Sequence, residues 1–365
     1  MKNSFGSSII VTLFGESHGE YIGAVLDGIA PGLKIDREYI DRKMALRRPA
    51  GSISTARIEM DEYKITSGEF NGYTTGAPLC VLIKNTNKNS SAYGEAMDIP
   101  RPGHADYTAR MKYHGFEDHR GGGHFSGRIT AALVAVGAIL GQALEAKGIK
   151  IGSHITELHG AFDRGFEDYN LDIDLVNQRP FPTLTEAAEE KMKKEIEKAR
   201  ENGDSVGGIL EGAVIGLPSG LGEPWFDNME SMLSHGLFSI PGVKGIEFGL
   251  GFAFADVYGS EGNDAFNICD GIVTTKSNNN GGINGGITNG MPITFRVAIK
   301  PTPSIFKAQH SISLSKNENV ILELDGRHDP CIVHRARAVV DAVTAIVIAD
   351  MLTVRYGTDY LATKE

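Results

Sequence analysis

A basic, histidine-rich stretch at residues 101–128 holds the side chains in this sequence that are best suited to chemistry. It carries five Lys/Arg against three acids, and four of the eleven histidines, in a chain whose formal net charge is -10. A local excess of positive charge in an acidic protein attracts an anionic ligand to that place. Three consecutive glycines at 121–123 let the backbone approach such a ligand closely. The apolar run that follows, 129–146, resembles a helix, and a helix N-terminus favours phosphate.

Two other interpretations of this stretch compete with an anion site. Glycine-rich loops are common, so the stretch could be a polar surface loop with a glycine hinge. His114, His119 and His124 recur every five residues, which raises the question of a metal site. That spacing suits neither one face of a helix nor one face of a strand, so we expect no metal.

Polar residues at two further places join the candidate chemistry. The segment Gly15-Glu16-Ser17-His18-Gly19 separates two apolar stretches, 8–13 and 22–26, that are expected to be strands. Loops between strands often carry function, although a plain hairpin turn is the alternative. A helix expected from Asp36 to about residue 48 ends in Arg47-Arg48, which either complements the helix dipole or clamps a phosphate or carboxylate.

The second half of the chain offers a glycine-rich patch and a proline-rich loop. The patch spans 277–290. A strand expected at 293–299 leads into residues 300–304, where prolines hold an extended loop and Lys300, Thr302 and Ser304 supply donors for a phosphate. No Gly-Lys dipeptide and no Gly-x-Gly-x-x-Gly occurs, so a Walker-A loop and a Rossmann dinucleotide site are not expected.

The elements that must position these residues predict one α+β domain over residues 1–365. Further strands are expected at 56–60, 78–83 and 150–157. Buried helices are expected at 127–147 and 335–352, and a solvated helix at 185–202. Residues 207–222 loosely echo 23–33, as a strand, a Pro/Gly turn and a helix, which hints at internal duplication. No composition break divides the chain.

Composition excludes several classes of protein. Acids outnumber bases by 46 to 36, which argues against a nucleic-acid partner. Three widely spaced cysteines indicate reduced thiols. The chain has no uncharged apolar run of 18 residues and no basic-then-apolar leader, so neither a membrane partner nor secretion is expected. We therefore expect a cytoplasmic protein.

Taken together, eight segments in order closely resemble the chorismate synthase family, and the resemblance covers essentially the whole chain. The segments are Gly15-Glu16-Ser17-His18-Gly19, Arg47-Arg48-Pro49, Arg101-Pro102-Gly103-His104-Ala105-Asp106-Tyr107, Arg120-Gly121-Gly122-Gly123, Gly203-Asp204-Ser205, Gly220-Leu221-Gly222-Glu223-Pro224, Lys300-Pro301-Thr302 and Gly326-Arg327-His328-Asp329-Pro330-Cys331. One departure follows the triple glycine. The familiar bacterial pattern is Arg-Ser-Ser-Ala-Arg, and here the chain reads His124-Phe125-Ser126-Gly127-Arg128.

The resemblance implies a fold of helices sandwiched between antiparallel sheets and a homotetramer. It implies a lyase of the shikimate pathway, which serves aromatic amino acid biosynthesis. The reaction is the anti-1,4-elimination of phosphate from 5-enolpyruvylshikimate 3-phosphate to give chorismate, with reduced FMN and no net redox change. Some members of the family reduce the flavin with NADPH. No reductase domain is visible here, so we expect an external reductant.

The resemblance and the charge of the substrate also imply roles for residues. His18 would donate a proton to the leaving phosphate, and His104 would protonate the pyrimidine side of the flavin. Asp329, with Ser17 and Ser126, would relay the proton at flavin N5. The residues expected to bind the flavin are His124, Phe125, Ser126, Gly286, Lys300, Pro301, Thr302, Pro303, Ser304 and Arg327. The residues expected to bind the substrate are Arg47, Arg48, Arg101 and Arg128.

Two other classes of protein remain open at this stage. An ordinary flavin oxidoreductase that uses NAD(P)H would consume one reductant per product. A non-catalytic phosphosugar-binding protein would bind the phosphate ester and release no phosphate.

Overall fold

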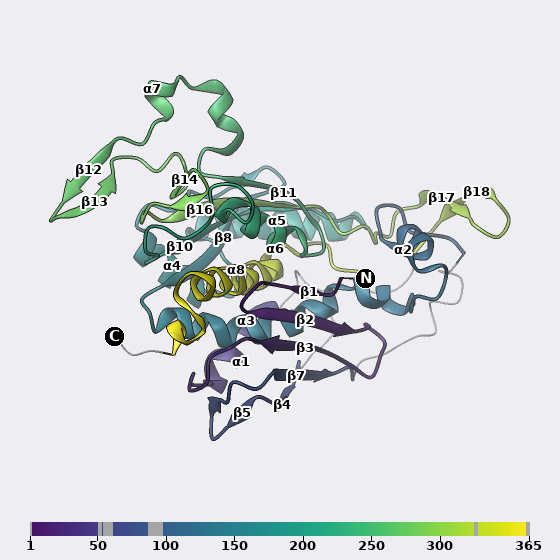
Figure 1. The fold of residues 1–365 in the computed structure, drawn as a ribbon. Helices are drawn as coiled ribbons and strands as arrows, with labels where there is room; N and C mark the ends of the chain where they lie inside the picture. The colour runs from purple at the N-terminus through teal and green to yellow at the C-terminus, as the bar shows by residue number, and fades with distance from the viewer. Residues whose placement is uncertain (1, 50–52, 54–60, 87–97, 325–327, 363–365) are drawn as a thin grey trace.

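The computed structural model describes residues 2–49, 53, 61–86, 98–324 and 328–362. Within them, two five-stranded antiparallel sheets enclose a layer of helices, as Figure 1 shows. One sheet comes from the first quarter of the chain and the other from the middle. The expected sandwich of helices between antiparallel sheets is confirmed.

The first sheet has the order β1-β2-β3-β7-β4. Its strands are β1 (Ser4–Phe5), β2 (Ile10–Gly15), β3 (Tyr21–Asp27), β7 (Leu79–Lys84) and β4 (Tyr63–Ser67). The second sheet has the order β11-β16-β10-β8-β9. Its strands are β11 (Val243–Phe248), β16 (Ile293–Ile299), β10 (Gly208–Ile215), β8 (Lys150–Leu158) and β9 (Ala161–Phe162). The two similar segments, 23–33 and 207–222, overlap the strands β3 and β10. Each of these strands lies at the centre of its sheet.

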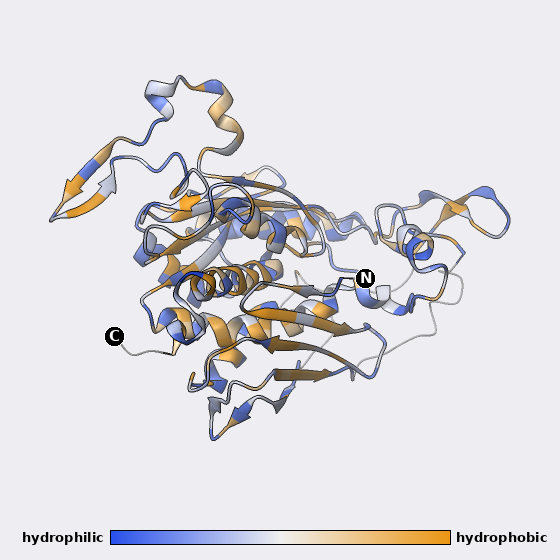
Figure 2. Ribbon diagram, in the orientation of Figure 1, coloured by the Kyte–Doolittle hydropathy of each residue, from blue (hydrophilic) through white to orange (hydrophobic). Residues whose placement is uncertain are grey.

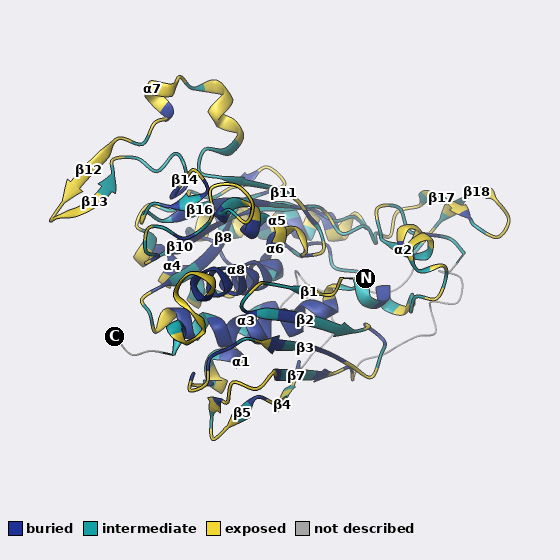
Figure 3. Cartoon of the chain, viewed as in Figure 1, coloured by how far each residue is buried: buried dark blue, intermediate teal, exposed yellow. Residues whose placement is uncertain are grey.

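Three helices form the layer between the sheets. They are α1 (Arg37–Arg47), α3 (Thr130–Glu145) and α8 (Val333–Tyr356). The helix α3 contacts β3 and β7, while α8 contacts β8 and β10, so this pair joins the sheets. A Cβ on Gly137 would lie 2.5 Å from the Cβ of Ala342, so glycine is what allows α3 and α8 to approach so closely. Figure 2 shows both helices as apolar, and Figure 3 shows them as buried.

The segment Gly127–Glu145 has the length and apolar composition of a membrane-spanning helix, yet most of it is buried between the two sheets. Packing against both layers explains why this helix is apolar on nearly every face.

Most of the expected elements are present, with shifted ends. Asp36 caps α1 by accepting a hydrogen bond from the backbone N–H of Tyr39 at 3.1 Å. Thr185 caps α5 (Glu186–Glu201), whose outer face is solvated as expected. The strand expected at 8–13 lies two residues later, as β2, because the backbone N–H groups of Ser7 to Ile9 instead bind the carboxylate of Asp350. The strand expected at 56–60 lies outside the described residues.

Smaller elements complete the chain. The helices are α2 (Asp106–Tyr113), α4 (Tyr169–Gln178), α6 (Met229–Phe238) and α7 (Gly259–Gly262), with 3-10 turns η1 (Arg120–Phe125), η2 (Gly127–Ile129), η3 (Gly251–Asp256) and η4 (Thr358–Leu361). The hairpins pair β5 (Glu69–Phe70) with β6 (Tyr73–Thr74), β12 (Phe266–Cys269) with β13 (Ile272–Thr275), β14 (Ile283–Asn284) with β15 (Ile287–Thr288), and β17 (Gln309–Ser313) with β18 (Glu318–Leu322). Residues 251–275, which we call the arm, project from the body in Figure 1.

Candidate active site

The triple-glycine turn lies at the centre of the candidate site. Gly121, Gly122 and Gly123 have φ angles of 62°, 84° and 54°, in the left-handed region that side chains rarely adopt. A Cβ on Gly121 would lie 2.5 Å from the imidazole of His18. A Cβ on Gly123 would lie 1.8 Å from a backbone carbonyl oxygen. Glycine is therefore required at these positions. Because glycine has no side chain, the turn can lie directly against the imidazole of His18.

The turn brings together two loops that are distant in the sequence. The backbone N–H of Ser17 donates to the carbonyl of Gly123 at 3.0 Å, and both Ser17 and His18 are buried. On the other side, the space next to Gly122 is bounded by the His104 ring at 3.5 Å and by the Cβ of Ser126 at 3.7 Å. Four of the five side chains expected to do proton chemistry, all except Asp329, are thus gathered around three glycines.

Asn85, which sequence reasoning missed, holds the 15–19 loop in place. Its side-chain N–H groups donate to the carbonyls of Glu16 and Gly19, each at 3.0 Å. Its side-chain oxygen accepts from Nε of Arg128 at 3.0 Å. A polar residue directly after an apolar strand was the only signal in the sequence, and such residues are common.

Arg101, His104 and Asp106 form a compact cluster at the start of α2. Nε and Nη2 of Arg101 donate to the two carboxylate oxygens of Asp106, each at 2.8 Å. Nδ1 of His104 lies 2.5 Å from Oδ1 of Asp106. Burial alone would raise the pKa of Asp106, but hydrogen bonds from Arg101 and then His104 outweigh it and hold that pKa well below its usual range.

Arg47 and Arg128 share one buried carboxylate. Arg47 donates to Oδ2 of Asp61 at 2.9 Å, and Arg128 donates to Oδ1 of the same residue. The side chain of Asp61 is 0% exposed, and those of the arginines are 5% and 6% exposed. Arg47 also donates to the hydroxyl of Thr130 at 3.0 Å. The two arginines expected to bind substrate are therefore neutralised in part by Asp61, a partner that the sequence did not indicate.

Arg48 differs from its neighbour. Its Nε atom is buried and has no hydrogen-bond partner among the residues that the structure describes. A buried donor left without a partner costs about 1–3 kcal/mol, so such a group is suited to a ligand that supplies the acceptor.

Arg335 links Asp329 and the 300–304 loop to the backbone of Arg47. Nη1 of Arg335 donates to Asp329 at 2.8 Å, and Nε of Arg335 donates to the carbonyl of Arg47 at 2.8 Å. The hydroxyl of Thr302 donates to the carbonyl of Asp329 at 2.6 Å. This arrangement joins the chain before α8 to the C-terminal end of α1.

The 300–304 loop also contacts the 101–106 segment. Lys300 donates to the carbonyl of Gly103, and Ser304 accepts from Nη1 of Arg101 at 3.3 Å. Pro303 lies 3.5 Å from the position of a Cβ on Gly103, and Pro301 packs against Gly207 in the same way, at 2.9 Å. Burial and then the nearby charge of Lys244 lower the pKa of Lys300.

His124 and Phe125 point in different directions from the end of the turn. Nδ1 of His124 lies 2.8 Å from the carbonyl oxygen of Gly15. Phe125 meets Tyr113 edge-on, with ring centroids 5.9 Å apart. Arg327 lies outside the described residues. Gly286 is not brought to this group, because it follows β14, which Figure 1 shows toward the left of the molecule while α2 lies toward the right.

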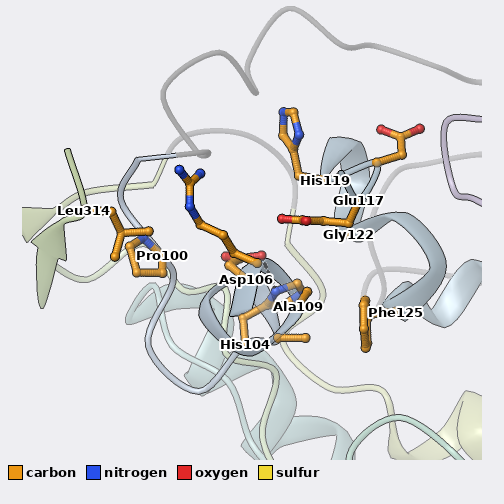
Figure 4. Close-up of a pocket in the computed structure, with 12 residues that line it drawn as sticks. Pro100, His104, Asp106, Ala109, Glu117, His119, Gly122, Phe125 and Leu314 are labelled. Atoms are coloured by element: carbon orange, nitrogen blue, oxygen red, sulfur yellow. Dashed lines mark ion pairs between the residues drawn. The ribbon is translucent and has the colours of Figure 1, made fainter. Parts of the chain in front are cut away.

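A hollow with an empty volume of about 450 Å³ opens beside the turn. Figure 4 shows His104 and Asp106 on one side of it and Phe125 on the other. Its lining is Pro100, His104, Ala105, Asp106, Ala109, Arg110, Glu117, Asp118, His119, Gly122, Phe125 and Leu314. Among the described residues, no three His, Cys, Asp or Glu side chains are arranged to hold a metal ion.

Comparisons with known proteins agree over nearly the whole chain. The family model described as "Chorismate synthase" matches residues 9–353. The chain is 48% identical to a chorismate synthase of Pyrococcus abyssi over 350 residues, which covers 96% of this chain and 97% of that protein. It is 46% identical to one of Thermococcus gammatolerans over 347 residues, 95% and 96% of the two chains. A solved structure titled "Crystal Structure of Chorismate Synthase" aligns with a TM-score of 0.75 and 28% identity, over 98% of this chain and 95% of that chain.

Proposed function

This chain belongs to the chorismate synthase family, and from that membership we propose how its residues bind the substrate and the flavin. It is a carbon–oxygen lyase of the shikimate pathway that eliminates phosphate from 5-enolpyruvylshikimate 3-phosphate to form chorismate. The observation that best supports the assignment of the site is the triple-glycine turn. It lies against the imidazoles of both His18 and His104.

The residues around the hollow suit a reduced flavin. Phe125 supplies an aromatic wall, and His104 supplies a ring nitrogen beside Gly122. Reduced FMN, when bound, supplies electron density that the elimination borrows and returns, so the overall oxidation state does not change.

Residues of the turn and of the 300–304 loop would hold the flavin. His124, Phe125 and Ser126 line the turn. Lys300 and Ser304 would offer donors to its phosphate. Thr302 would hold the loop through its bond to the carbonyl of Asp329, and Pro301 and Pro303 would keep the loop extended. Arg327 is assigned to the flavin by resemblance alone. Gly286 remains a prediction from resemblance, and the arrangement described above gives it no support.

Arginines bind the anionic groups of the substrate. Arg48 offers its buried Nε, and Arg101 offers Nη1, whose contact with Ser304 is long at 3.3 Å. Arg47 and Arg128 are buried and attract the substrate through their charge. Their two guanidiniums and the carboxylate of Asp61 together leave a net charge of about +1.

Side chains around the triple-glycine turn transfer the protons of the reaction. His18 donates a proton to the oxygen of the leaving phosphate, since a protonated imidazole both neutralises charge and supplies the proton. His104 would take up and return a proton at the pyrimidine side of the flavin. Ser17 and Ser126 carry a proton between the hollow and Asp329.

Arg48→Ala is expected to raise the substrate KM about 10-fold or more while weakening FMN binding much less. Losing one hydrogen bond to a charged group costs roughly 1.5–3 kcal/mol, which corresponds to that change. The measurement is KM from steady-state kinetics beside the Kd of FMN from fluorescence titration. Equal weakening of both ligands would contradict the assignment of Arg48 to the substrate.

Phosphate release under anaerobic conditions tests the proposed function directly. One equivalent of reduced FMN is expected to support many turnovers and to remain reduced at the end, while oxidised FMN supports none. Oxidation of one flavin per product would instead indicate a flavin oxidoreductase, and binding of the phosphate ester without release would indicate a binding protein. NADPH oxidation by the protein with FMN alone would contradict our expectation of an external reductant.

Assembly and location are proposed from the same membership. The arm carries exposed apolar side chains, including Phe252, Phe266 and Ile268, which are between 72% and 86% exposed. A two-stranded hairpin with such a surface is marginal by itself, which supports a homotetramer that buries it. A monomeric mass in native mass spectrometry would contradict this. Cys80, Cys269 and Cys331 form no disulfide, which supports a cytoplasmic location.

A further inference from the structure

The carboxylate of Asp106 makes contacts that separate the two nitrogens of the His104 ring. Oδ1 of Asp106 lies 2.5 Å from Nδ1 of His104 and 2.8 Å from Nη2 of Arg101. Oδ2 accepts from Nε of Arg101 at 2.8 Å and from its backbone N–H at 3.0 Å. The three side chains are only 13% to 18% exposed, so solvent competes little for these bonds.

The charges in this cluster decide which nitrogen of His104 carries a proton. Asp106 is ionised, because the guanidinium of Arg101 bonds both of its oxygens. An ionised carboxylate only accepts hydrogen bonds, so a ring nitrogen 2.5 Å away must be the donor. Nη2 of Arg101 also lies 3.1 Å from Nδ1 and has a second N–H that could donate to it. A bare Nδ1 would then face Oδ1 of Asp106 at 2.5 Å as one acceptor against another, with no proton between them, which is unfavourable. Nδ1 of His104 is therefore protonated.

The other nitrogen faces the hollow. Nε2 of His104 lies 3.5 Å from the position that a Cβ on Gly122 would occupy. No described residue makes a hydrogen bond with Nε2. Because Gly122 has no side chain, the space in front of Nε2 is left for a ligand.

We infer that Asp106 is a positioning residue, which fixes the proton on Nδ1 of His104 and so directs Nε2 at the ligand in the hollow. Carboxylate–imidazole pairs act in this way in other enzymes, where the partner sets the tautomer and the orientation of the ring. The consequence for turnover rests on the proposed function, in which Nε2 of His104 takes up a proton beside the flavin and returns it. The position of the proton on the His104 ring does not depend on the proposed function.

Nitrogen-15 NMR of His104 in the ligand-free protein tests the ring directly. The wild-type ring is expected to be protonated at Nδ1. Asp106→Asn is expected to shift the ring toward the Nε2–H form, and Asp106→Glu, which keeps the charge, to retain Nδ1–H. A wild-type ring protonated at Nε2, or a ring unchanged by Asp106→Asn, would overturn the inference.

A double-mutant cycle tests the consequence for catalysis. Asp106→Asn is expected to lower kcat by roughly 10- to 100-fold in the wild-type background. In the His104→Ala background the same change should cost less than about twofold, because a residue that acts through another has no effect once its partner is gone. Equal losses in both backgrounds would show that Asp106 acts independently of His104.

Asp172→Asn is the matched control. Asp172 also binds a guanidinium at two points, with Arg164 at 2.8 Å and 2.6 Å, but on α4 and away from the hollow. This variant is expected to lose the stability that such a pair provides and to keep the wild-type kcat. Absence of phosphate release in the wild-type protein would contradict the proposed function, whereas the NMR result would still decide the role of Asp106.

Discussion

Replacing His18 with alanine is expected to lower turnover with reduced FMN by about 10²- to 10⁴-fold, the range for general acid–base groups. The imidazole is buried between the 15–19 loop and Gly121, so water cannot readily take its place as a proton donor. The change removes the proton for the leaving phosphate but leaves the arginines that bind the substrate. We therefore expect kcat to fall while the Kd of FMN and the substrate KM change little.

His154→Ala is the control for His18→Ala. His154 is also buried, but it lies on β8 and bonds Glu211 at 2.8 Å, in the second sheet. That variant should lose stability and keep its turnover per folded molecule. Wild-type turnover by folded His18→Ala, measured as phosphate released, would remove His18 from the mechanism.

Asp61→Asn is expected to lower the free energy of unfolding by about 3–5 kcal/mol. Removing one partner from a buried ionic cluster leaves uncompensated charge, and here two guanidiniums would lose their shared carboxylate. Asparagine has nearly the same shape as aspartate. It also tolerates the φ of 49° at this position, so the change isolates the charge. Urea denaturation measures the difference.

Asp172→Asn again supplies the comparison. Its partner Arg164 is 34% exposed, so solvent can compensate that guanidinium, and we expect a loss of about 1 kcal/mol or less. Losses of similar size in the two variants would show that Asp61 is not the counter-charge on which Arg47 and Arg128 depend.

Local signals in the sequence predicted the helices better than the partners of their side chains. Asp36 and Thr185 marked the starts of α1 and α5 because a capping side chain bonds a backbone N–H within its own turn. The runs that became α3 and α8 were apolar enough to predict burial. The arm and the β17–β18 hairpin were not predicted, because short strands outside a core lack a clear alternation of apolar and polar residues.

The candidate site was harder to predict, because its contacts join distant parts of the chain. The side chain of Lys300 bonds the carbonyl of Gly103, which is about two hundred residues away in the sequence. No local sequence pattern predicts that contact. Arg47 was expected to clamp a ligand, yet it pairs with Asp61, a residue that nothing in the sequence singled out. The family resemblance named the 15–19, 101–107 and 120–123 segments, which the fold brings together, whereas the buried counter-charges required coordinates. The echo between β3 and β10 stays a prediction.

The triple-glycine turn also limits how this enzyme can change by mutation. Every single-base change of a glycine codon that is not silent introduces a stop or a residue with a side chain, and a residue in left-handed backbone costs roughly 1–2 kcal/mol before any collision. At positions 121 and 123 the added Cβ would also meet other atoms at 2.5 Å and 1.8 Å. Gene libraries for altered activity should therefore keep these three codons fixed. The diversity belongs at His124 and Phe125, where this chain already departs from the bacterial pattern.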